Sequence, residues 1–194
     1  IMNAFNKLQE TVGGNDSLII FYAGHGELLE TQNEGYWLPS DADQNDEFNW
    51  ISNSYIKSKI RALEARNILL VADSCFSGFL TRGVNIKTLE TNLTTEASTS
   101  RLEEFQKTKS RVVISSGGLE PVLDGIGNEN SIFANELISL LNKSQGAVTS
   151  TEIYSEIRDR VVEKSIKMGN KQVPFMGTLV EAGHEGPDFV FIPD

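Results

Sequence analysis

Two residue types that cooperate in covalent catalysis each follow an apolar run in this sequence. His25 lies in "YAGHGE", at the end of the run "SLIIFYA" (17–23). Cys75, the only cysteine of the chain, lies in "DSCFSG", directly after "NILLVA". A thiol is a good nucleophile only as the thiolate, and a nearby imidazole can promote or use that state. The two residues therefore predict acyl transfer through a thioester, if the fold brings them together.

Acyl transfer needs two further features that this sequence offers beside the same residues. The imidazole of His25 can act as the acid that protonates the leaving amine. The tetrahedral intermediate needs hydrogen-bond donors for its oxyanion, and the backbone N–H groups of Gly26 and Cys75 are the natural candidates. Gly24, Gly26 and Gly78 let the backbone turn tightly and approach a ligand closely.

The elements that must position these residues follow from hydrophobic periodicity. Continuous apolar runs of strand length are typical of a parallel sheet that is buried on both faces, and we expect strands at 17–23, 67–73 and 111–116. "DFVFIP" (188–193) predicts a last short strand that Pro193 stops. Functional groups of an open α/β sheet gather at the carboxyl ends of its strands. Neighbouring parallel strands would therefore deliver His25 and Cys75 to one edge.

Helical periodicity alternates with these runs, and the order of elements predicts an open α/β sheet flanked by helices. Apolar residues repeat at helical spacing in four segments, which are 1–12, 52–66, 131–143 and 151–164. Ser52 or Asn53 is the candidate N-cap of the second helix, and the last begins near 149–151. The segment 26–39 predicts a hairpin, with turn residues at 33–35.

Composition restricts the class of protein. At 194 residues the chain is long enough for one domain with a substantial core, and we expect one domain over 1–194. A formal net charge of −10 and a pI of about 4.7 argue against nucleic acid as a partner. The longest apolar run is too short to span a membrane. A single cysteine excludes an internal disulfide and favours a reducing compartment, the cytoplasm.

The first residues predict that the domain is incomplete at its N-terminus. Ile1, Phe5 and Leu8 lie on one face of a helix that Gly13 and Gly14 end. A chain that begins inside a helix indicates a piece of a longer protein. An upstream regulatory domain or partner is therefore an expectation.

The motifs "YAGHG" and "DSCFSG", in this order, resemble the caspase-like cysteine peptidases, above all their bacterial, metacaspase and paracaspase branches. A histidine roughly 50 residues upstream of the cysteine is a known property of caspases. Further segments resemble the family, namely "GYWLPSDAD", "ISSGGLEP", "IFANELISLL" and "QVPFMGTL" with "GPDFVF". The resemblance implies a six-stranded, mostly parallel sheet, of which the sequence predicts four strands. The family's first strands would lie upstream of Ile1.

The resemblance also implies which substrates the domain accepts. Animal caspases carry Gln two residues before the cysteine and bind a substrate Asp, whereas metacaspases and paracaspases carry an acid there. Here that position is Asp73, and Glu120 in "SSGGLE" resembles a second pocket acid. A carboxylate in such a pocket pairs with a guanidinium in bidentate fashion. Cleavage after Arg or Lys is therefore expected.

Two other features of the family carry over less completely. Some metacaspases bind calcium through clustered aspartates, and Asp41, Asp43 and Asp46 lie together in "PSDADQNDE". Where the family has a later acidic pair, this chain has Ser52 and Asn53. Arg82 occupies the position seven residues after the cysteine. No metal or other cofactor is therefore expected. The segment 81–110 reads as an exposed linker whose basic residues make self-cleavage a hypothesis.

Alternative readings remain for each residue. A lone cysteine after a buried strand can be a small core residue, and His25 can be a turn residue. Asp73 can cap the turn that follows it, and Glu120 can be a solvated loop acid. His184, in "AGHEGPD", reads as a surface-loop residue. The alternative for the whole chain is a catalytically silent, caspase-like interaction module.

Overall fold

A computed structural model of the chain describes residues 1–43, 46–75, 80, 107–118 and 130–192. Its central sheet contains four strands in the order β1-β5-β6-β8. The first three strands are parallel to one another, and the fourth is antiparallel to β6. Their bounds are Ser17–Ala23 (β1), Asn67–Asp73 (β5), Ser110–Ser115 (β6) and Phe175–Thr178 (β8). The expected open, mostly parallel sheet is confirmed.

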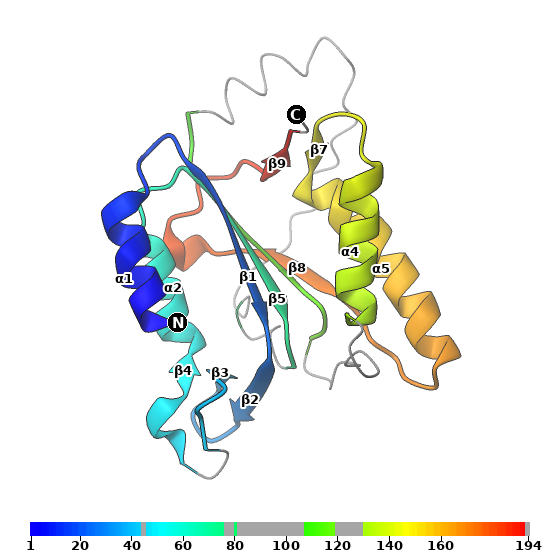
Figure 1. The fold of residues 1–194 in the computed structure, drawn as a ribbon, viewed down its shortest axis with the longest axis horizontal. Helices are drawn as coiled ribbons and strands as arrows, with labels where there is room; N and C mark the ends of the chain where they lie inside the picture. Colours follow the sequence, from blue (N-terminus) through cyan, green and yellow to red (C-terminus); the bar gives the residue numbers. More distant parts are fainter. Residues whose placement is uncertain (44–45, 76–79, 81–106, 119–129, 193–194) are drawn as a thin grey trace.

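Helices cover both faces of this sheet (Figure 1). The pair α1 (Met2–Thr11) and α2 (Asn53–Ala62) lies on one face, and the pair α4 (Ile132–Lys143) and α5 (Ser150–Lys167) lies on the other. Side chains of β5 alternate between two cores, because successive residues of a strand point to opposite faces. Ile68 and Leu70 join the core under α1 and α2, whereas Leu69 and Val71 join the core under α4 and α5.

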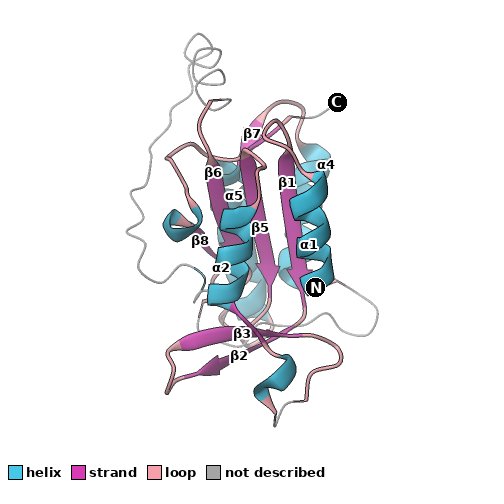
Figure 2. Ribbon diagram, turned by 90° about the vertical axis from the view of Figure 1, so that its left-hand side faces the viewer, coloured by secondary structure: helices cyan, strands magenta, loops and turns pink. Residues whose placement is uncertain are grey.

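A small antiparallel sheet lies beyond the carboxyl end of β1 (Figure 2). It contains β2 (His25–Leu29), β3 (Glu34–Leu38) and β4 (Ile51–Ser52). The predicted hairpin is therefore present, but its turn comes earlier than expected. Asn33 adopts a positive φ of 53°, and Gly35 is already part of β3, opposite Leu28. Asparagine tolerates this left-handed conformation better than most residues do.

Strand β1 differs from the prediction that all three apolar runs are buried on both faces. Within the sheet of the described residues it pairs only with β5, and so forms an edge. Ile19 and Phe21 remain 49% and 51% exposed on the side of α4 and α5. Strand β6 matches the prediction, because each of its residues is buried. An apolar run therefore predicted a strand correctly in both places, but not the position of that strand in the sheet.

The last predicted strand is present but does not belong to the main sheet. The short strand β9 (Val190–Phe191) pairs with β7 (Val148–Thr149) in a separate two-stranded sheet. The fourth strand of the main sheet is β8, for which the sequence shows no strand pattern. Its four residues, "FMGT", contain a glycine and are too few to show a period.

Side-chain caps fix where the helices begin. Ser52 and not Asn53 caps α2, since its hydroxyl accepts from the backbone N–H of Tyr55. Thr149 caps α5 in a reciprocal capping box with Glu152. Ser131 caps α4 by accepting from the backbone N–H of Ala134. Such caps satisfy N–H groups that have no partner inside the helix.

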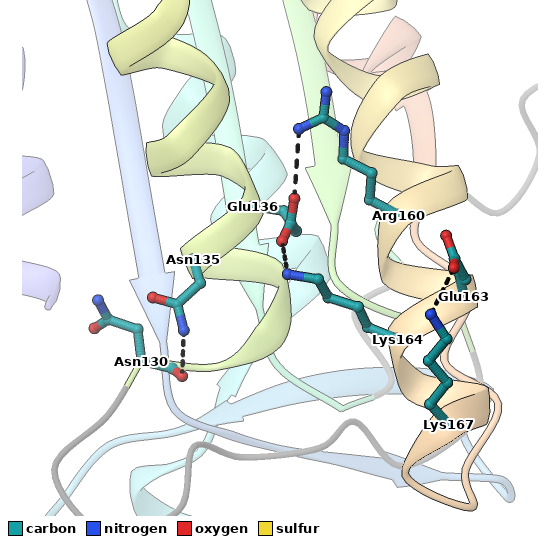
Figure 3. A network of polar contacts seen from close by, with 7 residues as sticks. All are labelled: Asn130, Asn135, Glu136, Arg160, Glu163, Lys164 and Lys167. Atoms are coloured by element: carbon teal, nitrogen blue, oxygen red, sulfur yellow. Dashed lines mark hydrogen bonds and ion pairs between the residues drawn. The ribbon is translucent and has the colours of Figure 1, made fainter.

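Helices α4 and α5 are joined by an ion-pair network as well as by their apolar faces (Figure 3). The carboxylate of Glu136, on α4, is buried and contacts both Lys164 and Arg160 of α5. A second pair, Glu163 with Lys167, lies on the exposed side of α5. The ion pairs of the buried Glu136 fix α4 against α5, and α4 begins beside the carboxyl end of β5.

No helix in the described ranges is both long enough and apolar enough to cross a membrane.

Candidate active site

The register between β1 and β5 brings the two candidate catalytic residues to one edge of the sheet. Ala23 of β1 pairs with Asp73 of β5, so both strands end at the same level. The backbone N–H of Gly24 donates to the carbonyl oxygen of Asp73 at 3.3 Å. His25 and Cys75 follow directly after these paired residues. The expectation that two parallel strands deliver them to a common edge is therefore realised in the backbone.

Gly26 packs directly on the segment that carries the thiol. A β-carbon added at Gly26 would lie 2.2 Å from the carbonyl oxygen of Cys75 and 2.7 Å from Oγ of Ser74. Both distances are too short for a real side chain, so only glycine permits this approach. The backbone on both sides of His25 is therefore in contact with residues 73–75. The proximity of Gly26 to Cys75 is compatible with a shared oxyanion site, and the donor role of the two N–H groups stays a prediction.

A buried tyrosine forms a hydrogen bond with the backbone of His25. The hydroxyl of Tyr22 donates to the carbonyl oxygen of His25 at 2.7 Å and also lies 3.2 Å from that of Leu38. Its ring stacks on Trp37, with the ring centroids 3.9 Å apart and the planes 2° from parallel. Burial raises the pKa of Tyr22 to about 12, so the hydroxyl stays protonated and remains a donor.

Tyr22 was not singled out from the sequence, although it belongs to the quoted motif "YAGHG". In that motif it is the last inward-facing residue of β1, and its partners come from β2 and β3. The signal that could have identified it is a polar aromatic residue in an otherwise aliphatic strand. A buried tyrosine usually finds a partner for its hydroxyl.

The two candidate catalytic side chains differ in exposure. His25 is exposed, and Cys75 is half-buried at the end of β5, beside the buried Ser74. Cys75 is therefore not fully buried, although small core residues usually are. Access from solvent is a requirement for a nucleophile that attacks an external substrate.

Asp73 is the last residue of β5 and is 9% exposed. Its Oδ2 accepts a hydrogen bond of 2.5 Å from the hydroxyl of Ser131, the N-cap of α4. Asp73 is thus linked to a helix far away in the sequence, a contact that no local pattern reveals. Glu120, the second proposed pocket acid, and Gly78 lie outside the described residues.

His184 is half-buried, whereas the sequence suggested a surface-loop residue. Its Nδ1 accepts a hydrogen bond of 3.0 Å from the backbone N–H of Arg111, near the start of β6. Burial lowers the pKa of His184 below its ordinary value of 6.5. It lies at the end of the sheet opposite Cys75, which follows the carboxyl end of the parallel strand β5. His184 therefore belongs to the support of the sheet and not to the candidate site.

Two aspartates of the acidic segment "PSDADQNDE" have structural roles. Asp46 caps a short 3-10 helix (Glu47–Asn49), and the carbonyl of Asp43 accepts from Nε1 of Trp50 at 2.8 Å. Asp41 is exposed. Among the residues that the structure describes, no group of three or more His, Cys, Asp or Glu side chains has the arrangement of a metal site. Most of the predicted linker, residues 81–106, lies outside the described part of the chain.

Comparisons with known proteins agree with the fold. The family model of the caspase domain matches residues 1–179. A crystal structure of a Geobacter sulfurreducens protein has the same fold, with a TM-score of 0.54 and 17% sequence identity, over 96% of this chain and 73% of that one. No curated protein matches the chain in sequence.

Proposed function

Because the chain belongs to the caspase-domain family, we propose that it is a cysteine endopeptidase that cleaves peptide bonds after Arg or Lys. Cys75 is the nucleophile and His25 the acid and base. The observation that carries the proposal is the contact of Gly24 with Asp73 and of Gly26 with Cys75, on either side of His25. These contacts keep the imidazole-bearing loop on the thiol-bearing segment.

The first half of the reaction forms the acyl-enzyme. The thiol of Cys75 gives its proton to His25, and the sulfur attacks the carbonyl carbon of the scissile bond. The oxyanion of the tetrahedral intermediate is stabilised by the backbone N–H groups of Gly26 and Cys75. As the C–N bond breaks, the imidazolium of His25 returns the proton to the leaving amine, and a thioester remains on Cys75.

The second half releases the acyl group. A water molecule gives a proton to His25 while its oxygen attacks the thioester carbonyl. The same backbone donors stabilise the second oxyanion. When the C–S bond breaks, the product carboxylic acid leaves, and the proton on His25 restores the thiol of Cys75. The enzyme is thereby returned to its starting state, and the reaction has consumed only the peptide and one water molecule.

The preference for a basic side chain is assigned to Asp73, assisted by Glu120. Asp73 lies two residues before Cys75, and its side chain is largely buried at the edge that carries the thiol. A desolvated carboxylate attracts a guanidinium or an ammonium group and disfavours a substrate Asp through like-charge repulsion. The acidic net charge of the chain is compatible with basic protein segments as substrates.

The test is hydrolysis of three fluorogenic peptides that differ only in the residue before the scissile bond, namely Arg, Lys or Asp. We expect cleavage after Arg and Lys, and none after Asp. Cys75→Ala and His25→Ala should each abolish it, because the covalent step needs both groups. Calcium is included in a parallel series.

Each result separates two hypotheses. Cleavage after Asp would leave the Cys-His pair in place and refute the role of Asp73. Failure to cleave any peptide, with folded protein and with calcium present, would contradict the peptidase and favour a caspase-like interaction module. Labelling of Cys75 by peptidyl chloromethyl ketones gives an independent readout. A peptidase of this specificity reacts faster with the basic reagent than with the acidic one.

A further inference from the structure

We propose that Ser131 is a positioning residue for substrate selection, because it holds the carboxylate of Asp73 in the orientation that receives a basic side chain. The inference rests on the proposed peptidase function and adds to it a residue from α4. Ser131 is 58 positions from Asp73 in the sequence, and the two side chains are joined by one hydrogen bond.

The two hydrogen bonds of the Ser131 hydroxyl fix its orientation. Its single O–H donates to Oδ2 of Asp73 at 2.5 Å, and its oxygen accepts from the backbone N–H of Ala134 at 2.9 Å. The hydroxyl thus links the charged group of Asp73 to the first turn of α4.

Ser131 is itself held firmly. Its carbonyl oxygen accepts from the backbone N–H of Asn135 at 3.0 Å. The side chain of Asn135 donates to the carbonyl oxygen of Asn130 at 3.1 Å (Figure 3). One turn along, Glu136 is paired with α5. The donor to Asp73 therefore projects from a helix end whose backbone is fixed on both sides.

A fixed carboxylate matters because recognition of a guanidinium is directional. Two parallel N–H···O bonds form only when the planes of carboxylate and guanidinium coincide. A carboxylate that rotates about its side-chain bonds must be ordered when the substrate binds, and this loss of entropy lowers the affinity. The first turn of α4 also places the positive end of its helix dipole beside Asp73, where it attracts the negative charge of a carboxylate. Without the hydroxyl of Ser131, binding of a basic side chain should weaken while the chemistry at Cys75 continues.

The competing explanation is that Ser131 is only a helix cap. Ser131→Gly separates the two roles, because glycine at an N-cap costs only a few tenths of a kcal/mol relative to serine but cannot donate to Asp73. Ser131→Thr keeps both hydrogen bonds and serves as the conservative rescue. Thr149→Gly is the matched control, since it removes a hydroxyl cap from the neighbouring helix at the end remote from Asp73.

The experiment compares peptides ending in Arg with peptides ending in citrulline, which has the same shape without the charge. The wild-type chain should prefer Arg. In Ser131→Gly we expect KM for the Arg peptide to rise roughly tenfold, the size of one charge-assisted hydrogen bond. We expect kcat, and both constants for citrulline, to change little. Ser131→Thr and Thr149→Gly should retain the preference. In an Asp73→Asn background, Ser131→Gly should add no further loss.

Three results would overturn the inference, and they are distinguishable. If Ser131→Gly keeps the wild-type ratio of Arg to citrulline, Ser131 is only a cap and the proposed function stands. If Ser131→Gly lowers kcat for both peptides equally, its effect is on the fold or the chemistry and not on Asp73. If the wild-type chain cleaves neither peptide and its Cys75 reacts equally with both matching chloromethyl ketones, the proposed function fails and this inference fails with it.

Discussion

Gly26 has no room for a side chain, because the carbonyl oxygen of Cys75 occupies the position where a β-carbon would extend. Gly26→Ala must therefore move the loop of His25 away from the thiol. A displacement of about 1 Å can cost roughly a hundredfold in rate when two reacting groups must be aligned. We expect kcat/KM for a basic peptide to fall by at least that factor, measured with protein that gives a normal unfolding transition.

Gly14→Ala is the control for the loss of a glycine as such. A β-carbon at Gly14 would meet nothing within 4 Å. The activity of Gly14→Ala should therefore match that of the unchanged chain. Equal activity of the two variants would show that the close approach of Gly26 to Cys75 is not needed for catalysis.

Tyr22 supports His25 through its hydroxyl and not only through its ring. Tyr22→Phe keeps the stacking on Trp37 but leaves the carbonyl groups of His25 and Leu38 without this donor. The expected loss is about 1–2 kcal/mol of unfolding free energy, together with a lower kcat because the imidazole is less well placed. Urea unfolding and peptide hydrolysis measure the two effects.

The matched variant for this prediction is Tyr36→Phe in β3, on the small sheet that Tyr22 packs against. The hydroxyl of Tyr36 donates to the exposed side chain of Gln32, so its loss should change the free energy of unfolding little. A Tyr22→Phe variant as stable and as active as Tyr36→Phe would refute the supporting role of the buried hydroxyl.

The residues of the candidate site were predictable from the sequence to different degrees. His25 and Cys75 stand in local motifs at strand ends, and local patterns are what a single sequence displays. Ser131 was recognised only as part of a helical segment, because its contact with Asp73 joins residues that are distant in the chain. A hydrogen bond of that kind depends on tertiary packing, which no periodicity encodes.

At the scale of elements, α4 connects the helical layer to the edge that carries Cys75, because it packs on α5 and its N-cap contacts Asp73. Its anchor is Glu136, a buried carboxylate between two cations of α5. Glu136→Gln keeps the shape of the side chain and removes its charge. We expect a loss of about 1–2 kcal/mol in the free energy of unfolding, because both cations stay partly in solvent and limit the cost.

Glu163→Gln is the matched control, because it removes an ion pair that lies within α5 and does not join the two helices (Figure 3). Both Glu163 and Lys167 are exposed, and an ion pair between exposed side chains contributes little to stability because solvent screens it. Chemical denaturation of both variants makes the comparison. Equal losses would contradict the view that Glu136 anchors α4.

The elements were predicted well where their own residues decide the outcome. The bounds of β1 and β5 coincide with the apolar runs 17–23 and 67–73. The edge position of β1 and the pairing of β8 with β6 were not predicted, because partners elsewhere in the chain decide them. The strand β9 was found in the sequence and assigned to the wrong sheet for the same reason.

At the scale of the whole molecule, one end of the central sheet carries the candidate catalytic residues and the other end contains residues that stabilise the fold. At the supporting end Arg111 is fully buried, and its guanidinium donates to four carbonyl oxygens, those of Leu63, Ala65, Arg66 and Ser110. These carbonyls belong to the connection between α2 and β5 and to the first residue of β6. The connection before the strand that carries Cys75 is thus fixed by a single buried side chain.

His184 completes this supporting end, and it makes the stability of the fold depend on pH. Burial lowers the pKa of its imidazole below 6.5, with Arg111 adding to the shift and Asp188 and Glu185 opposing it. The folded state therefore takes up a proton less readily than the unfolded state. Above pH 6.5 both states are neutral at this residue and the full stability is present. As the pH falls below 6.5, the unfolded state gains the proton first, and the free energy of unfolding decreases until the lowered pKa of the folded state is reached.

Urea unfolding at pH 7.5 and at pH 5.5 tests this dependence, and we expect the lower midpoint at pH 5.5. His184→Asn isolates the residue, because the amide oxygen can still accept from the backbone N–H of Arg111 but does not titrate. The variant should unfold at more nearly equal urea concentrations at the two pH values. An unchanged pH dependence in His184→Asn would assign the effect to other groups. Since His184 and Cys75 lie at opposite ends of the sheet, the variant should also leave the pH profile of peptide hydrolysis unaltered, which separates the support of the fold from its chemistry.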